Sequence, residues 1–158
     1  MTRAYARARR GHRAVDYAPH GHWNTTTLVA GVTCQAAVAP MVLDGPMDAS
    51  AFDAYLGQVL IPALPHGSVV VMDNLPAHKT AAVTALMRDA GLELRYLPPY
   101  SPDFNPIELM WAKVKGHLRS VKARTKDELH DAIAEALGKI SPNDAKGFFC
   151  HCGVGVIS

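Results

Sequence analysis

A short run of apolar residues that ends in an acid constrains this chain more than any other feature. Val69–Met72 is followed at once by Asp73, which predicts a buried strand with a carboxylate at its carboxyl end. A Pro-rich turn at 100–106 then opens a helix that carries Glu108, and 34 residues separate the two acids. Two carboxylates brought together at the end of a sheet can hold divalent cations, which promote attack on phosphodiesters.

The composition predicts one globular domain. The chain has 158 residues, of which 49% are hydrophobic and 19% charged, so it has enough apolar surface for an ordinary core. No apolar run reaches the length of about 18 residues that a membrane span needs. The Arg-rich segment 1–13 lacks the apolar centre of a signal peptide, so we expect a cytoplasmic protein. Three cysteines do not predict a disulfide framework.

The charge distribution has two possible interpretations. The net charge is only +2, but basic residues gather in two segments. Local basic clusters fit a polyanion such as nucleic acid, although a ragged terminus and a solvated helix face would look the same. The two segments contain Arg3, Arg7, Arg9, Arg10 and Arg13, and Lys113, Lys115, Arg119, Lys122, Arg124 and Lys126.

The residue pattern predicts an α/β fold. The second half alternates strands and helices, which favours parallel strands buried between helices, whereas the first two strands should pair antiparallel. Asp73 then lies where open α/β sheets bind their ligands. We expect strands at 25–34, 39–43, 68–72 and 92–97, and helices at 49–64 and 79–90. A third helix begins at Pro106 and has an apolar stripe that extends to Leu118. A fourth runs from a Thr125–Glu128 capping box to about 140, and a fifth from Pro142 toward 149.

Several of these residues also carry a resemblance to a known family. The segments that match are 72–74, Ala77–His78, the run 97–102 and Asn105–Glu108, together with Pro19–Trp23 near the start. The chain resembles the catalytic domain of a mariner-like bacterial insertion-sequence DDE transposase, and the resemblance covers essentially all of residues 1–158. It implies an RNase H-like mixed sheet flanked by helices.

The resemblance implies roles for individual residues. Asp73 and Glu108 match the second and third acids of the family, which makes them the expected catalytic and metal-binding residues for two Mg²⁺ or Mn²⁺ ions. His78 and Asn105 would lie near that site. The expected partner is DNA, both transposon ends and target. A second copy of the chain or the product of an upstream reading frame is a possible protein partner, and no membrane is expected. DNA would be contacted by Arg7, Arg9, Arg10, Lys113, Lys115 and Arg119.

No residue matches the first acid of the family, nor the strand that carries it. Asp16 and Asp44 are the nearest candidates. The residues around Asp16 do not resemble the Asp-Glu context of the first acid in the family, and Asp44 precedes Gly45-Pro46, which predicts a turn. Helix-turn-helix modules are also absent. We therefore expect an N-terminally truncated catalytic domain that performs metal-dependent hydrolysis and strand transfer incompletely. The alternative is a catalytically dead remnant that acts only as a DNA-binding or assembly module.

Some of the singled-out residues have simpler explanations. Asp73 can cap a turn with its carboxylate, and Glu108 can favour a helix N-terminus through the helix dipole. His78 can be a solvated side chain. Cys150 and Cys152 flank His151, yet no second Cys/His pair accompanies them, so a zinc site is a weak expectation. The missing strand also predicts an exposed sheet edge and self-association.

Overall fold

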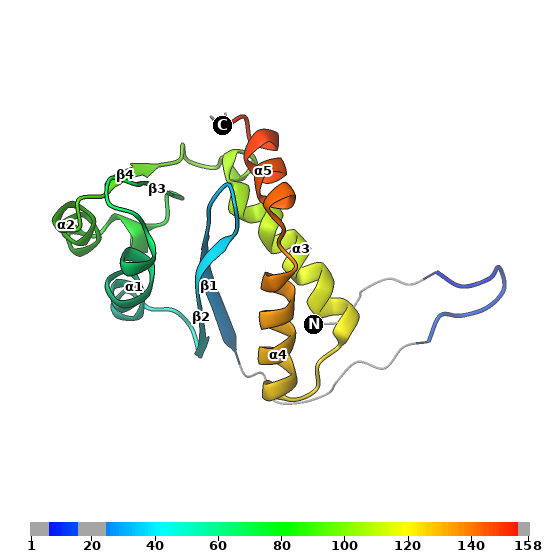
Figure 1. The fold of residues 1–158 in the computed structure, drawn as a ribbon. Helices are drawn as coiled ribbons and strands as arrows, with labels where there is room; N and C mark the ends of the chain where they lie inside the picture. Colours follow the sequence, from blue (N-terminus) through cyan, green and yellow to red (C-terminus); the bar gives the residue numbers. More distant parts are fainter. Residues whose placement is uncertain (1–6, 16–24, 155–158) are drawn as a thin grey trace.

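The computed structural model describes residues 7–15 and 25–154. The hairpin of β1 (Thr26–Val32) and β2 (Ala37–Asp44) lies between two groups of helices (Figure 1). On one side lie α1 (Ala49–Tyr55) and α2 (Ala81–Asp89), and on the other α3 (Pro106–Val121), α4 (Lys126–Gly138) and α5 (Pro142–His151). The predicted early motif Pro19–Trp23 and the candidate Asp16 lie outside the described residues. None of the helices described is long and apolar enough to cross a membrane.

The first two strands form an antiparallel hairpin, as predicted. β1 (Thr26–Val32) pairs with β2 (Ala37–Asp44), with Thr26 opposite Asp44 and Val32 opposite Ala37. The register shifts between Val29 and Gly31, where Ala39 has a φ of 51° and Pro40 has no N–H to donate. β2 begins two residues before the predicted strand start, at 37 instead of 39.

The next two strands are parallel. β3 (Val69–Met72) pairs in register with β4 (Glu93–Tyr96), and α2 (Ala81–Asp89) forms the crossover between them. Thr80 caps α2, and Gly91 follows the helix with a φ of 68°, a left-handed conformation that commonly ends helices. Residues 79 and 80 are not part of α2, because the 3-10 turn η3 (Pro76–Lys79) precedes the cap.

The helix predicted over 49–64 changes type along its length. α1 (Ala49–Tyr55) is capped by Asp48 and continues as a π-helical segment, η1 (Leu56–Leu60), and a 3-10 turn, η2 (Ile61–Ala63). Pro62 cannot donate a backbone hydrogen bond, which favours an end to regular helix at this point.

Local capping signals define the three C-terminal helices. Asn105 caps α3 (Pro106–Val121), and the predicted capping box of Thr125 and Glu128 opens α4 (Lys126–Gly138). Ser141 and Asp144 form a second capping box, which opens α5 (Pro142–His151). The short turn η4 (Pro102–Phe104) precedes α3.

Two apolar clusters fix the layers. One joins α1, α2 and one face of both strand pairs, and includes Val29, Met41, Val70, Met72 and Leu94. The other joins the opposite face of the hairpin to α3 and α4 through Leu28, Ala30, Met110, Val114 and Ala136. The hairpin is therefore covered on both faces, whereas β3 and β4 are covered on one.

The strand pairs differ from the prediction in two respects. In the described part of the chain they form two separate two-stranded sheets, without a hydrogen-bonded ladder that would make them one mixed sheet. β3 is also not fully buried, because Val69 and Val71 are 50% and 53% exposed on the face away from Met72. The sequence pattern could not reveal this, since a run of valines does not say how many of its faces are covered.

Candidate active site

Asp73 lies directly after β3, at the carboxyl end of the parallel strands. Its Oδ1 accepts a hydrogen bond of 3.3 Å from the backbone N–H of Leu75 and lies 2.7 Å from Nδ1 of His78. Oδ2 has no hydrogen-bond or ion-pair partner among the described residues. The side chain is 43% exposed, so this oxygen is accessible from solvent. Asp73 thus caps a turn, as its simpler explanation required, while Oδ2 has no partner among the described residues.

Three elements hold His78 beside Asp73. His78 lies in η3, and its ring stacks on Phe52 of α1 with the centroids 4.4 Å apart and the planes at 24°. Its carbonyl accepts a hydrogen bond of 2.6 Å from the hydroxyl of Tyr96, which ends β4. The His78 side chain is only 20% exposed. Nδ1 approaches Oδ1 closely, but its N–H is not aligned for a linear hydrogen bond.

Glu108 lies in the first turn of α3. Asn105 holds the start of this helix, because its Oδ1 accepts a hydrogen bond of 3.4 Å from the N–H of Ile107. Glu108 is exposed, and its charge is favoured at the positive end of the helix dipole. Asn105 therefore shapes the start of the helix that carries Glu108.

A small pocket of about 140 Å³ surrounds Glu108 and contains residues from the other end of the chain. His151 and Cys152, at the end of α5, line it together with Asn105 and Glu108. Burial, and then the charge of Asp103, raises the pKa of the Cys152 thiol. Sequence reasoning did not place α5 at Glu108, because only the packing of α5 on α3 brings them together. Within the described residues, no group of three His, Cys, Asp or Glu side chains could hold a metal ion, which leaves the zinc expectation without support.

The structure relates Asp73 and Glu108 through the backbone. The N–H of Leu97 donates a hydrogen bond of 2.9 Å to the carbonyl of Met72, the residue before Asp73. The loop to α3 therefore departs from the same edge of the β3–β4 sheet that carries Asp73. Asp73 does not line the pocket that contains Glu108.

The predicted DNA-contacting residues differ in their surroundings. Lys113 forms an ion pair with Asp144 of α5, and this contact holds the pKa of the Asp144 carboxyl at about 2. Lys115 and Arg119 are exposed on α3, and no ion pair involves either of them within the described part of the chain. Arg7, Arg9 and Arg10 are exposed as well.

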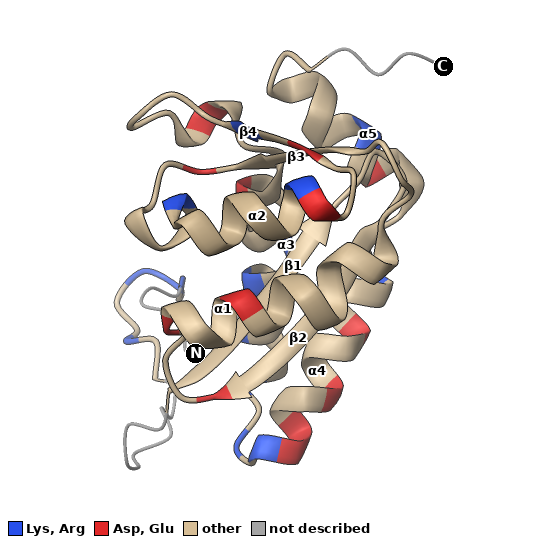
Figure 2. Ribbon diagram, turned by 90° about the vertical axis from the view of Figure 1, so that its left-hand side faces the viewer, with Lys and Arg blue, Asp and Glu red and all other residues tan. Residues whose placement is uncertain are grey.

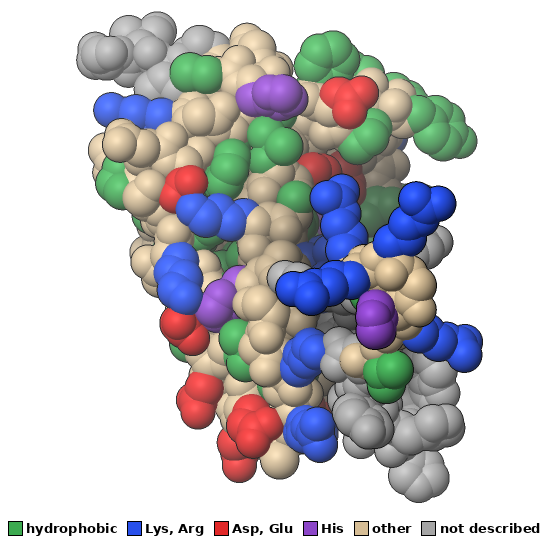
Figure 3. Space-filling model, turned by 90° about the vertical axis from the view of Figure 1, so that its right-hand side faces the viewer, with side chains coloured by type: hydrophobic (Ala, Val, Ile, Leu, Met, Phe, Trp, Pro, Cys, Tyr) green, Lys and Arg blue, Asp and Glu red, His purple; other side chains and the backbone are tan. Residues whose placement is uncertain are grey.

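Charges of opposite sign gather on different elements. Acidic residues recur along α4 (Figure 2), where Asp127, Glu128, Asp131 and Glu135 lie. In the space-filling view, Lys and Arg side chains gather over the middle of one face, while acidic side chains lie mostly at its lower left and also near its top (Figure 3). A basic surface of this kind favours the approach of polyanions.

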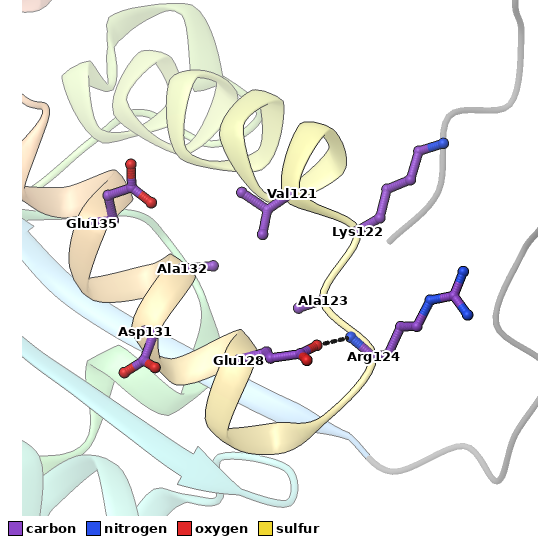
Figure 4. A pocket seen from close by; sticks show the side chains of 8 residues that line it. All are labelled: Val121, Lys122, Ala123, Arg124, Glu128, Asp131, Ala132 and Glu135. Atoms are coloured by element: carbon purple, nitrogen blue, oxygen red, sulfur yellow. Dashed lines mark hydrogen bonds between the residues drawn. The ribbon is translucent and has the colours of Figure 1, made fainter.

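A hollow larger than the pocket at Glu108 lies away from the candidate site. It has a volume of about 450 Å³ and lies where α3 turns into α4, between Val121 and Glu135. Lys122 and Arg124 point away from it, while the Glu128 carboxylate accepts a hydrogen bond from the Arg124 backbone N–H (Figure 4). The backbone N–H groups of Arg124 and Thr125 lower the pKa of Glu128, and Lys139 lowers that of Glu135. Glu128 and Glu135, two of the acids that line this hollow, therefore already have partners within the fold.

Helices around short strands, with an acid at the carboxyl end of a parallel strand, place the chain among α/β domains, which commonly bind ligands at that edge. The comparison with known families is specific. The profile of the family described as "DDE superfamily endonuclease" matches residues 1–130, so the chain belongs to this family and the predicted resemblance is confirmed.

Two curated relatives come from Caenorhabditis briggsae. The Tcb2 transposase is 26% identical over 119 residues, which cover 72% of this chain and 44% of that protein. The Tcb1 transposase is 29% identical over 107 residues, which cover 65% and 39%. The chain therefore spans less than half the length of these relatives.

Solved structures show the same fold. The Mos1 strand transfer complex superposes with a TM-score of 0.75 at 17% identity, covering 96% of this chain and 46% of that chain. The Mos1 transposase catalytic domain with Raltegravir and Mg superposes with a TM-score of 0.66 at 14% identity, covering 85% and 83%. The predicted α/β, RNase H-like fold is confirmed.

Proposed function

We propose that residues 1–158 form the catalytic domain of a DNA transposase, in which Asp73 and Glu108 are metal ligands. The observation that carries the proposal is the state of Asp73, whose Oδ1 is held by Leu75 and His78 while Oδ2 stays open to solvent. The relatives are transposases, and one Mos1 structure is a paired-end complex with Mn. Carboxylate oxygens suit Mg²⁺ and Mn²⁺, so the residues fit this metal as part of a larger ligand set.

The chain's own residues would position DNA and the ions. Divalent ions in such a site lower the pKa of the attacking water and neutralise charge on the phosphate. Asp73 would provide Oδ2 as a ligand and Glu108 its carboxylate from the start of α3. Lys115 and Arg119 would bind DNA phosphates, whereas Lys113 would contribute less because Asp144 already neutralises it. We place the reaction at transposon ends and target DNA, in the bacterial cytoplasm.

We further propose that the catalytic set is incomplete in residues 1–158. Two carboxylates hold Mg²⁺ weakly, because this ion demands near-octahedral geometry and retains its water ligands. The separate strand pairs support this view, since β1 and β3 each pair with a single strand in the described structure. A further acid-bearing strand, from an upstream segment or a second copy of the chain, would supply the strand-pairing hydrogen bonds and also the missing metal ligand.

The test combines plasmid nicking with metal binding. We expect no nicking by the wild-type chain in Mg²⁺ or Mn²⁺, and weak Mn²⁺ binding that Asp73→Asn and Glu108→Gln each reduce. Nicking that Asp73→Asn abolishes would show a complete enzyme and overturn the proposed incompleteness. DNA binding without any Mn²⁺ effect of the two variants would instead favour the alternative, a DNA-binding or assembly module.

A further inference from the structure

The contact between His78 and Asp73 suggests a role for the histidine that the family match does not assign. The two residues are joined through Nδ1 and Oδ1 at 2.7 Å. The same Oδ1 accepts the N–H of Leu75, so both protein contacts fall on one oxygen of the carboxylate. Both contacts restrain the side chain through this one oxygen and leave Oδ2 without a partner among the described residues.

The position of His78 is itself determined by its neighbours. The ring is stacked on Phe52, and the backbone carbonyl is bonded to the Tyr96 hydroxyl. Lys79 lies over the Tyr96 ring, with its Nζ 5.7 Å from the centroid, which further restrains this turn. Because α1, η3 and β4 all contribute, His78 is better restrained than the more exposed Asp73.

We propose that His78 is a positioning residue, which holds Oδ1 of Asp73 so that Oδ2 is directed to a divalent cation. The inference rests on the proposed function, because it assumes that Asp73 is a metal ligand. Groups that orient metal ligands commonly change metal affinity by roughly 10- to 100-fold when they are removed. Preorganised ligands bind more tightly because less conformational freedom is lost on binding.

Two substitutions separate the nitrogen contact from the packing of the ring. His78→Phe keeps an aromatic ring to stack on Phe52 but removes the nitrogen that faces Asp73. His78→Asn has an amide N–H₂ near the position of Nδ1 but loses the stacking. His130, exposed on α4, provides the matched control His130→Phe.

Two measurements report on the proposal. The first is Mn²⁺ affinity, from the free-ion signal in electron paramagnetic resonance. The second is hydrogen exchange of the Leu75 amide in the metal-free chain, by nuclear magnetic resonance. For His78→Phe we expect Mn²⁺ binding about tenfold weaker and faster exchange at Leu75. His78→Asn should restore most of the Mn²⁺ affinity and most of the protection of the Leu75 amide. His130→Phe should change neither quantity, and each variant should keep the melting temperature of the wild-type chain.

The outcomes distinguish this inference from the proposed function. Wild-type values of both quantities in His78→Phe would overturn the positioning role. Equal losses in His78→Phe and His78→Asn would overturn it too, since packing of the native ring would then explain them. If Asp73→Asn leaves Mn²⁺ binding unchanged, the proposed metal site fails, and the inference about metal fails with it. Leu75 exchange would still show whether His78 holds Asp73.

Discussion

Lys113 of α3 and Asp144 of α5 form an ion pair that joins two neighbouring helices. The Asp144 carboxylate also accepts hydrogen bonds from the backbone N–H of Ser141 at 2.9 Å and from its hydroxyl at 2.6 Å. One carboxylate therefore both caps α5 and fastens it to α3. Since the end of α5 lines the pocket at Glu108, this contact also helps to define the surroundings of that acid.

The Asp144 contacts predict a specific loss of stability in acid. The hydrogen bond from Lys113, followed by those from Ser141, lowers the Asp144 pKa from 3.8 to about 2. A lowered pKa means that the fold favours the charged form, so its stabilisation is present above pH 3.8 and is lost as the pH falls through about 2. Asp144→Asn should reduce the free energy of unfolding at pH 6 and flatten its dependence between pH 4 and 2, measured by urea unfolding. Asp131→Asn, at an exposed acid of α4, should leave that dependence unchanged.

Truncation of the core under α3 should destabilise the domain. Met110 is fully buried between α3, α4 and the hairpin. Met110→Ala should lower the free energy of unfolding by about 2–5 kcal/mol, because it removes buried apolar surface and leaves a cavity. Lys115→Ala, at an exposed position of the same helix, should change it by less than about 0.5 kcal/mol. Similar urea midpoints for the two variants would contradict the assigned packing.

The exposed face and free edge of β3 should promote self-association. Val69 and Val71 are half exposed, and in the described structure β3 pairs only with β4. Val71→Lys should shift the chain toward monomer in sedimentation velocity, because a charge on an edge strand disfavours strand pairing with another copy. Val121→Lys, at the end of α3, provides a control of equal chemistry, since Val121 is 43% exposed. An equal effect of both substitutions would point to net charge and not to the β3 edge.

DNA affinity should depend on the exposed basic residues of α3. Lys115→Ala and Arg119→Ala should each weaken binding to duplex DNA and reduce the salt dependence of log K by about one. Lys113→Ala should have a smaller effect because of its Asp144 partner. Arg88→Ala, on α2, serves as the control, because Arg88 pairs with Asp89 and α2 packs on the other side of the hairpin. Fluorescence anisotropy across a salt series measures all four variants.

Local sequence signals predicted the helices and strands well. Features that depend on contacts between distant segments were not predicted. The caps at Asn105 and Thr125 act within four residues, so the sequence displays them directly. The position of Asp73 after its strand and its closeness to His78 followed from local spacing as well. In contrast, the division into two sheets and the approach of His151 and Cys152 to Glu108 depend on contacts between distant segments. No periodicity within one segment reports such contacts.

The hydrogen bond from Leu97 to Met72 divides the segment between the two acids into parts with different tolerance to changes in length. Residues added at the turn of Ala90 and Gly91 lie before this anchor, so the loop to α3 would still start beside Asp73. Residues added between Leu97 and Asn105 lie after it and would displace Glu108 directly. The length of the segment from Leu97 to α3 therefore positions Glu108 relative to Asp73, whereas the total number of residues between the two acids does not.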